Sequence, residues 1–232
     1  MRRAYVLVAI VAIGVLLGGV SKTSPATDEN TEDGFIALFN GEDLTGWTGD
    51  KIGHRVEEGV LVANPLGNLY TETEYDDFIF RFEFKLTPGA NNGIGIRVPM
   101  KGKASSEGME IQILDDTADK YADVNPWQRH GSIYGVVPAT PGHLKPVGEW
   151  NMQEIHVQGT QVRVVLNDAV IVDADLAPFR DGAPAPDGKE HPGLLRNRGH
   201  ISLAGHNTKV LFRNLAIKPL QGDKKSKTPE TP

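Results

Sequence analysis

Apolar and polar residues alternate along much of this chain, and the clearest case is the segment FIFRFEFKL at 78–86. A period of two is typical of a β-strand with one face in a core and the other in water. No stretch has ten or more residues with a convincing helical period. After an apolar strand that begins at Phe35, the strands that we expect are 55–62, 69–71, 78–86, 93–98, 109–114, 133–136, 151–158, 161–166, 169–173, 200–204 and 209–219.

Turn-forming residues separate these segments. Asn167 and Asp168 join two β-branched runs, and both residue types tolerate the positive φ that a tight hairpin requires. The chain contains 26 glycines and 15 prolines, which favours many short strands over long helices. We expect the proline-rich stretch 177–198 to be a long surface loop. The pattern predicts an all-β fold, a sandwich of two antiparallel sheets.

The stretch 91–116 supplies the two strands around which we expect a binding face. With Ile94, Ile96 and Val98 in the core, the alternation predicts that Gly93, Gly95 and Arg97 lie on the open side, where Glu110 and Gln112 of the next strand join them. Glycine within a strand is often kept where a ligand approaches closely. The open face therefore suits a flat polar ligand such as a sugar ring. The alternative is a solvated sheet face in which the glycines mark a bulge.

The amino terminus has the pattern of an export signal, because Arg2 and Arg3 precede an apolar run that ends in small residues. We expect a signal peptide at 1–21, a flexible linker at 22–33, one domain at 34–220 and a disordered tail at 221–232. The protein is then periplasmic or extracellular, with an uncleaved membrane anchor as the alternative. The chain has no cysteine and hence no disulfide, and its net charge of -6 argues against nucleic-acid binding.

Six motifs occur in a fixed order along the presumed domain: FNGEDLTGW, NNGIGIRV, EIQILDD, IYG, GEWN with a following LND hairpin, and LFRNLAIKPL. Together they resemble the 3-keto-disaccharide hydrolase domain family, from about Phe35 to Leu220. The resemblance implies a concanavalin A-like jelly-roll sandwich, exported by bacteria, that acts on sugars whose C3 hydroxyl is oxidised to a ketone. One position departs from the family pattern: Ala204 stands where a glutamine usually occurs two residues before the histidine, here His206.

The residues also favour a particular reaction. Ordinary glycoside hydrolysis uses two carboxylates, but the expected strand carries the amide of Gln112 beside Glu110. In a 3-keto sugar the ketone acidifies the C2 proton, and loss of that proton expels the group on C1. This elimination, or a net hydrolysis, needs a base, donors for the enolate oxygen and an acid for the leaving group.

Glu110 is one candidate base, with Arg97 and Gln112 as donors, and we expect Arg97 to hold the carboxylate ionised. Histidine is the rival base, because its unperturbed pKa suits neutral proton transfer. The candidate catalytic residues are Glu110, His130 and His206; the weaker histidines are His54, His143, His156, His191 and His200. The candidate substrate-binding residues are Arg97, Gln112, Asn92, Trp127 and Tyr134, of which the two aromatic rings stack on a sugar or are simply buried.

No cofactor is expected. The segment 115–125 concentrates oxygen ligands, so calcium is conceivable, but its spacing lacks the turn glycine of a calcium loop and favours a solvated loop. The expected partner is a small carbohydrate, with no nucleic acid, and with a membrane only if the amino-terminal segment stays uncleaved. A carbohydrate-binding module without turnover is the alternative to an enzyme, because this fold hosts both. A surface interaction protein has little support.

Overall fold

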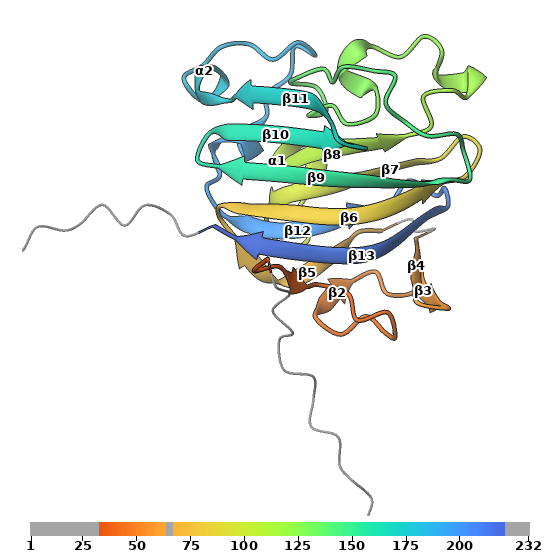
Figure 1. Cartoon of the computed structure of the whole chain (residues 1–232). Coiled ribbons are helices and arrows are strands. Elements are labelled where there is room, and N and C mark those ends of the chain that lie inside the picture. The colour runs from red at the N-terminus through yellow and green to blue at the C-terminus, as the bar shows by residue number, and fades with distance from the viewer. Residues whose placement is uncertain (1–32, 64–66, 221–232) are drawn as a thin grey trace, which may run out of the picture.

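The computed structural model describes residues 33–63 and 67–220, which form two packed β-sheets (Figure 1). The expected signal peptide at 1–21, nearly all of the linker at 22–33 and the expected tail at 221–232 lie outside the described residues. Among the residues that are described, no helix is long and apolar enough to cross a bilayer.

The described residues contain short strands and very short helices. The strands are β1 (Ile36–Ala37), β2 (Trp47–Gly49), β3 (His54–Glu57), β4 (Val60–Ala63), β5 (Leu69–Tyr75), β6 (Phe78–Leu86), β7 (Asn91–Val98), β8 (Met109–Leu114), β9 (Trp150–Gln158), β10 (Gln161–Leu166), β11 (Ala169–Asp175), β12 (Gly199–Ala204) and β13 (Val210–Pro219). The helices are α1 (Ala104–Glu107) and α2 (Ala177–Arg180), with 3-10 turns η1 (Asp119–Tyr121), η2 (Pro126–Gln128) and η3 (Pro192–Leu195).

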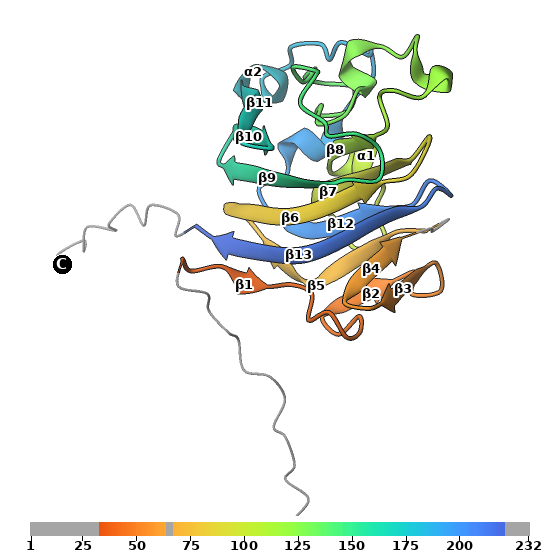
Figure 2. The same cartoon turned by 45° about the vertical axis from the view of Figure 1, so that its right-hand side comes forward.

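The two sheets lie face to face (Figures 1 and 2). The larger has eight strands in the order β11-β10-β9-β6-β13-β4-β3, with β1 paired to β13, and the smaller has five in the order β2-β5-β12-β7-β8. Every strand pair in both sheets is antiparallel. The predicted all-β sandwich of two antiparallel sheets is therefore confirmed.

The core lies between the sheets and is built from the apolar face of each strand. On β6 the burial alternates along the whole strand, so that every second side chain from Phe78 to Leu86 is buried. Rings from this strand pack against one another and against Phe212 of β13. A fully buried phenylalanine contributes about 1.5–3 kcal/mol relative to an exposed one, so this strand is a major source of stability.

Three local predictions can be compared with the strands. The predicted strand 55–62 is two strands, because Glu58 and Gly59 have φ of 50° and 79° and form a turn between β3 and β4. The hairpin at Asn167 and Asp168 is present, with φ of 47° and 70°. Residues 133–136 are not a strand, since Ile133 forms isolated bridges to Ile111 and Val137.

A bulge in β7 changes which side chains face the core. Val98 pairs with His200 whereas Gly95 pairs with Ser202, so β7 has one extra residue at this point, and Arg97 has φ of 53°. Val98 consequently lies in a small apolar cluster separate from the main core, and Arg97 is buried. The predicted faces of Val98 and Arg97 are wrong, because strict alternation fails at a bulge.

Candidate functional site

The outer side of β7 and β8 carries the candidate site. We call this surface the polar face and define it by Gly93, Gly95, Glu110 and Gln112. Gly95 pairs with Glu110 and Gly93 with Gln112, while Ile94 and Ile111, which lie between them, belong to the main core. Because cross-strand partners share a face, the four residues lie together. The sequence pattern had grouped the same four residues.

Glu110 and His206 meet on this face. Glu110 Oε1 lies 3.4 Å from Nε2 of His206, which follows β12, and the Glu110 side chain is 5% exposed whereas that of His206 is 43% exposed. Gly93 allows this arrangement, since a Cβ there would lie 1.9 Å from Glu110 Oε1. The pair therefore joins a largely buried carboxylate to an accessible imidazole, and the two groups can share or exchange a proton.

A segment beyond β8 lies alongside Glu110. The backbone N–H of Tyr134 donates to Glu110 O at 2.8 Å, and Gly131 N–H donates to Gln112 O at 2.8 Å. Tyr134 therefore lies directly beside Glu110, joined to it by a backbone hydrogen bond. The Trp127 ring meets the Tyr134 ring edge to face, with 5.5 Å between centroids. The structure thus places Tyr134 next to Glu110, and Trp127 next to Tyr134.

The amide of Gln112 is already oriented within the polar face. Its Nε2 donates to Asn91 Oδ1 at 3.2 Å. The Gln112 side chain is buried, so it is fixed rather than free in solvent. Its second N–H and its oxygen form no hydrogen bond with residues 33–63 or 67–220, which leaves this amide able to bind a polar ligand group.

The space above Gly95 is filled by the protein. A Cβ at Gly95 would lie 2.2 Å from Ser202 Oγ and 2.8 Å from Ala104 Cβ. Ala104 begins α1 and packs with Val98, Tyr70 and Ala204. The prediction that both glycines clear room for a ligand is therefore wrong for Gly95. Ala204, at the position of the missing glutamine, is buried in the same cluster.

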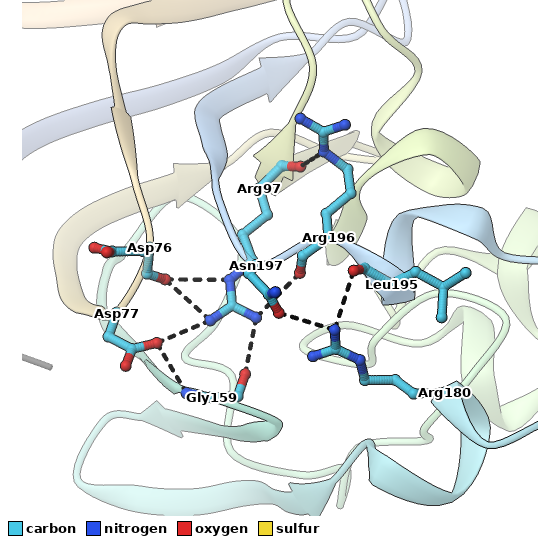
Figure 3. A network of polar contacts seen from close by, with 8 residues as sticks. All are labelled: Asp76, Asp77, Arg97, Gly159, Arg180, Leu195, Arg196 and Asn197. Atoms are coloured by element: carbon cyan, nitrogen blue, oxygen red, sulfur yellow. Dashed lines mark hydrogen bonds and ion pairs between the residues drawn. The ribbon is translucent and has the colours of Figure 1, made fainter. Parts of the chain in front are cut away.

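Arg97 does not belong to the polar face (Figure 3). Its guanidinium donates to Asp76 O at 3.0 and 3.1 Å, to Gly159 O at 2.8 Å and to Arg196 O at 3.3 Å, and it forms an ion pair of 3.0 Å with Asp77. Burial lowers the pKa of Arg97, and the neighbouring Asp77 carboxylate opposes that effect. The predicted roles of Arg97, as a substrate contact and as the partner of Glu110, are wrong.

Asn92 and His130 lie inside the sandwich. Asn92 is fully buried and pairs with Ile113 on the core side of the sheet. His130 stacks on Phe84 at 5.1 Å between ring centroids, and its Nε2 lies 3.0 Å from Gln153 Oε1. Neither side chain shares the face of Glu110, so the structure separates both residues from the candidate site. His130 is instead a hydrogen-bonded core residue.

Because His130 is buried, we expect the free energy of unfolding to fall at acid pH. Burial lowers the pKa of His130 to about 4 from its usual 6.5. Because the unfolded state binds the proton first, the contribution of neutral His130 is complete above pH 6.5 and is lost as pH falls toward 4. A shift of this size corresponds to about 3 kcal/mol. We expect denaturant-unfolding free energies measured at pH 7, 5.5 and 4 to fall by about this amount.

His130→Gln keeps hydrogen-bonding groups but cannot titrate, so its stability should depend less on pH in this window. The exposed His143→Gln is the matched control and should follow the wild type. Asp116, whose pKa is raised by burial, stays in place in both variants and so does not affect the comparison. Parallel pH profiles for His130→Gln and the wild type would contradict the prediction.

The acidic segment 115–125 does not gather into a metal site. Asp115 accepts hydrogen bonds from the backbone N–H groups of Gly89 at 2.8 Å and Thr117 at 3.0 Å. Burial by itself would raise the pKa of Asp115, but these bonds and that of the Thr117 hydroxyl bring it below its usual value. Within the part of the chain that the structure describes, no three His, Cys, Asp or Glu side chains are grouped to hold a metal ion.

The loop 177–198 contains a pair that the sequence pattern did not single out. His191 Nε2 lies 3.0 Å from Asp187 Oδ1, and the two side chains are 5% and 2% exposed. The spacing of four residues was the only signal in the sequence, and it carries little information within a loop. Only the folded loop shows that the two side chains are in contact.

The amino-acid sequence and the fold both match known proteins. A family model described as the 3-keto-alpha-glucoside-1,2-lyase-like domain matches residues 34–218. A "3-keto-disaccharide hydrolase" from Bacteroides thetaiotaomicron is 26% identical over 231 residues, covering 81% of this chain and 79% of that protein.

Two solved structures from Parabacteroides distasonis, both named as candidate glycosyl hydrolases, are similar over most of this chain. One has a TM-score of 0.73 and 28% identity, covering 80% of this chain and 99% of its own. The other has a TM-score of 0.72 and 26% identity, covering 85% and 99%. The family match covers most of the chain and coincides with the sandwich that carries the polar face. The chain belongs to the 3-keto-alpha-glucoside-1,2-lyase-like domain family.

Proposed function

We propose that this protein is a carbohydrate-active enzyme that cleaves 3-keto-glycosides on the polar face. The observation that carries the proposal is the 3.4 Å approach of the buried Glu110 carboxylate to the accessible His206 imidazole. The family membership and the name of the Bacteroides relative support the substrate class. The amide of Gln112 stands where a two-carboxylate mechanism would need an acid, which supports elimination over ordinary hydrolysis.

In the proposed reaction Glu110 removes the proton from C2, next to the C3 ketone. The electron pair from the C–H bond forms the enolate, and a polar donor such as the Gln112 amide hydrogen-bonds to its oxygen. The C1–O bond then breaks, and the leaving oxygen takes up a proton. The products are a 1,2-unsaturated 3-ketone and the free aglycone. Addition of water across the new double bond would complete a net hydrolysis.

His206 has the accompanying role of proton exchange with Glu110. The imidazole of His206 is exposed to water and adjacent to the carboxylate, so it can return the abstracted proton to solvent between turnovers. Trp127 and Tyr134, on the flank of Glu110, supply aromatic surface against which a sugar ring can pack. Export to the periplasm or the cell exterior is also proposed, supported by the apolar segment at 4–20.

The test uses purified protein with 3-keto-trehalose and with 4-nitrophenyl 3-keto-glucoside, in both anomeric forms. Released glucose or nitrophenol, together with a new unsaturated ketone by NMR, is the expected result. In D2O the C2 proton should exchange in the presence of the protein. Measurable binding without release or exchange would contradict the proposal and indicate a carbohydrate-binding module.

A further inference from the structure

The Asp187–His191 pair in the loop 177–198 is held in a defined orientation. Besides the 3.0 Å contact with His191, Asp187 Oδ1 accepts the backbone N–H of Lys189 at 3.0 Å. Burial alone would raise the pKa of Asp187, but these hydrogen bonds bring it below its usual value. The carboxylate is therefore ionised at neutral pH. Its contact with Nε2 holds the His191 ring in one orientation.

The pair packs on Gly135, in the segment that lies alongside Glu110. The backbone N–H of Asp187 donates to Gly135 O at 3.3 Å. A Cβ at Gly135 would lie 2.7 Å from Asp187 Oδ2 and 2.7 Å from His191 Cε1, and the positive φ of 80° also favours glycine there. Gly135 follows Tyr134, whose N–H binds the Glu110 carbonyl. Backbone hydrogen bonds through Gly135 and Tyr134 therefore connect Asp187 to the backbone of Glu110.

A second contact fixes the loop at the beginning of β8. Gly193, in η3, approaches Gly108 so closely that a Cβ at Gly193 would lie 2.0 Å from Gly108 O. Gly108 precedes Met109, the first residue of β8, and Glu110 is the next. The loop is thus anchored on both sides of the strand end that carries Glu110, and His191 lies between these two anchors in sequence.

A cavity of about 530 Å³ opens beside His191, between α2 and η3. Its walls include Phe179, Arg180, Leu194 and Leu195, so it combines an aromatic ring and aliphatic groups with a cation. Asp187 contacts only Nε2 of His191, and Nδ1 forms no hydrogen bond with residues 33–63 or 67–220. The cavity is large enough for a sugar or aryl group.

We propose that His191, oriented by Asp187, donates the proton to the leaving group of the 3-keto-glycoside while that group occupies the cavity between α2 and η3. As the C1–O bond breaks, the leaving oxygen takes the proton from Nδ1, and its aglycone becomes an alcohol. The ring keeps its Nε2 proton on Asp187 and becomes neutral. The C2 proton has meanwhile passed to Glu110, and exchange with water restores both groups. This inference rests on the proposed function and adds the acid that Glu110 and His206 do not supply.

The test compares leaving groups within one variant. A nitrophenolate leaves without a proton, whereas a methoxide needs one. For His191→Gln we expect kcat on methyl 3-keto-glucoside to fall by about 100-fold or more, and kcat on the 4-nitrophenyl compound to fall by less than about fivefold. Asp187→Asn should change the same ratio in the same direction. Because both substrates meet the same protein, their ratio does not depend on the folded fraction.

His156→Gln is the matched control, since His156 also contacts a carboxylate, that of Glu154 at 2.9 Å, but on the larger sheet. Its ratio should equal that of the wild type. If His191→Gln lost kcat equally on both substrates, the pair would have a structural role and the inference would be overturned. An unchanged kcat on both substrates would also overturn it. If the wild type turned over neither substrate, the proposed function itself would fail, and that outcome is distinct from a failure of the His191 assignment.

Discussion

Glu110→Gln is expected to lower kcat on 3-keto-glycosides by about 10²- to 10⁴-fold, the usual contribution of a positioned general base. Glutamine keeps the size of the side chain that lies over Gly93, so it preserves the packing of the polar face. Its neutral amide cannot accept the C2 proton. The expected signature is a loss of both aglycone release and C2 exchange in D2O, with substrate affinity largely kept, measured by steady-state kinetics and NMR.

Glu83→Gln is the matched control for this variant. Glu83 lies on β6 and accepts hydrogen bonds from Arg213 at 2.6 and 3.0 Å, on the larger sheet. Its replacement removes one carboxylate, as Glu110→Gln does, but leaves the polar face unchanged. We therefore expect kcat to stay within about twofold of the wild type. Turnover close to that of the wild type in Glu110→Gln would remove Glu110 as the base and leave His206 as the candidate.

Arg97→Met is expected to destabilise the folded protein by about 3–5 kcal/mol, the range found when one partner of a buried ion pair is removed. The side chain is 3% exposed, and its donors reach three backbone carbonyls besides Asp77. Without the guanidinium these carbonyls and the carboxylate lose their partners within a largely buried site. In a domain of this size the melting temperature should fall by about 6–20 °C, measured by calorimetry.

Arg97→Lys should be nearly as destabilising, because one ammonium group cannot reproduce the planar fork of donors. Arg163→Met is the control: Arg163 lies 3.7 Å from Asp173, and both side chains are about half exposed or more, at 49% and 64%. An exposed pair of this kind contributes about 0–1 kcal/mol. If Arg97→Met kept the melting temperature of the wild type but lost substrate binding, Arg97 would be a ligand-binding residue after all.

The sandwich itself could be predicted from local pattern. The bounds of the strands at 78–86, 109–114 and 161–166 agree with the structure, since each has alternating or β-branched residues and a clear turn signal at its end. Two of the places where the pattern failed, at Glu58 and at Arg97, have positive φ on a residue other than glycine. Turn and bulge residues of this kind give no hydrophobic signal, because their conformation depends on the pairing of neighbouring strands.

The candidate site could be predicted only in part. Glu110 and Gln112 alternate with core residues of β8, so their shared face followed from the sequence. His130 was selected by its motif, yet the packing of β6 and β9 against it makes it a core residue. The Asp187–His191 pair was missed, because a long proline-rich loop has no periodicity from which its position can be deduced.

The sequence by itself determined the two-sheet sandwich, the family, and the common face of Gly93, Glu110 and Gln112, because all three depend on residue order along single strands and on short motifs. Only the tertiary structure decided that Arg97 joins three separate segments of the chain (Figure 3). It alone also decided that His206 reaches Glu110. It also decided that His191, in the loop 177–198, packs on Gly135. These contacts join residues far apart in the chain, and their geometry is set by strand register, a bulge and loop packing rather than by any local pattern.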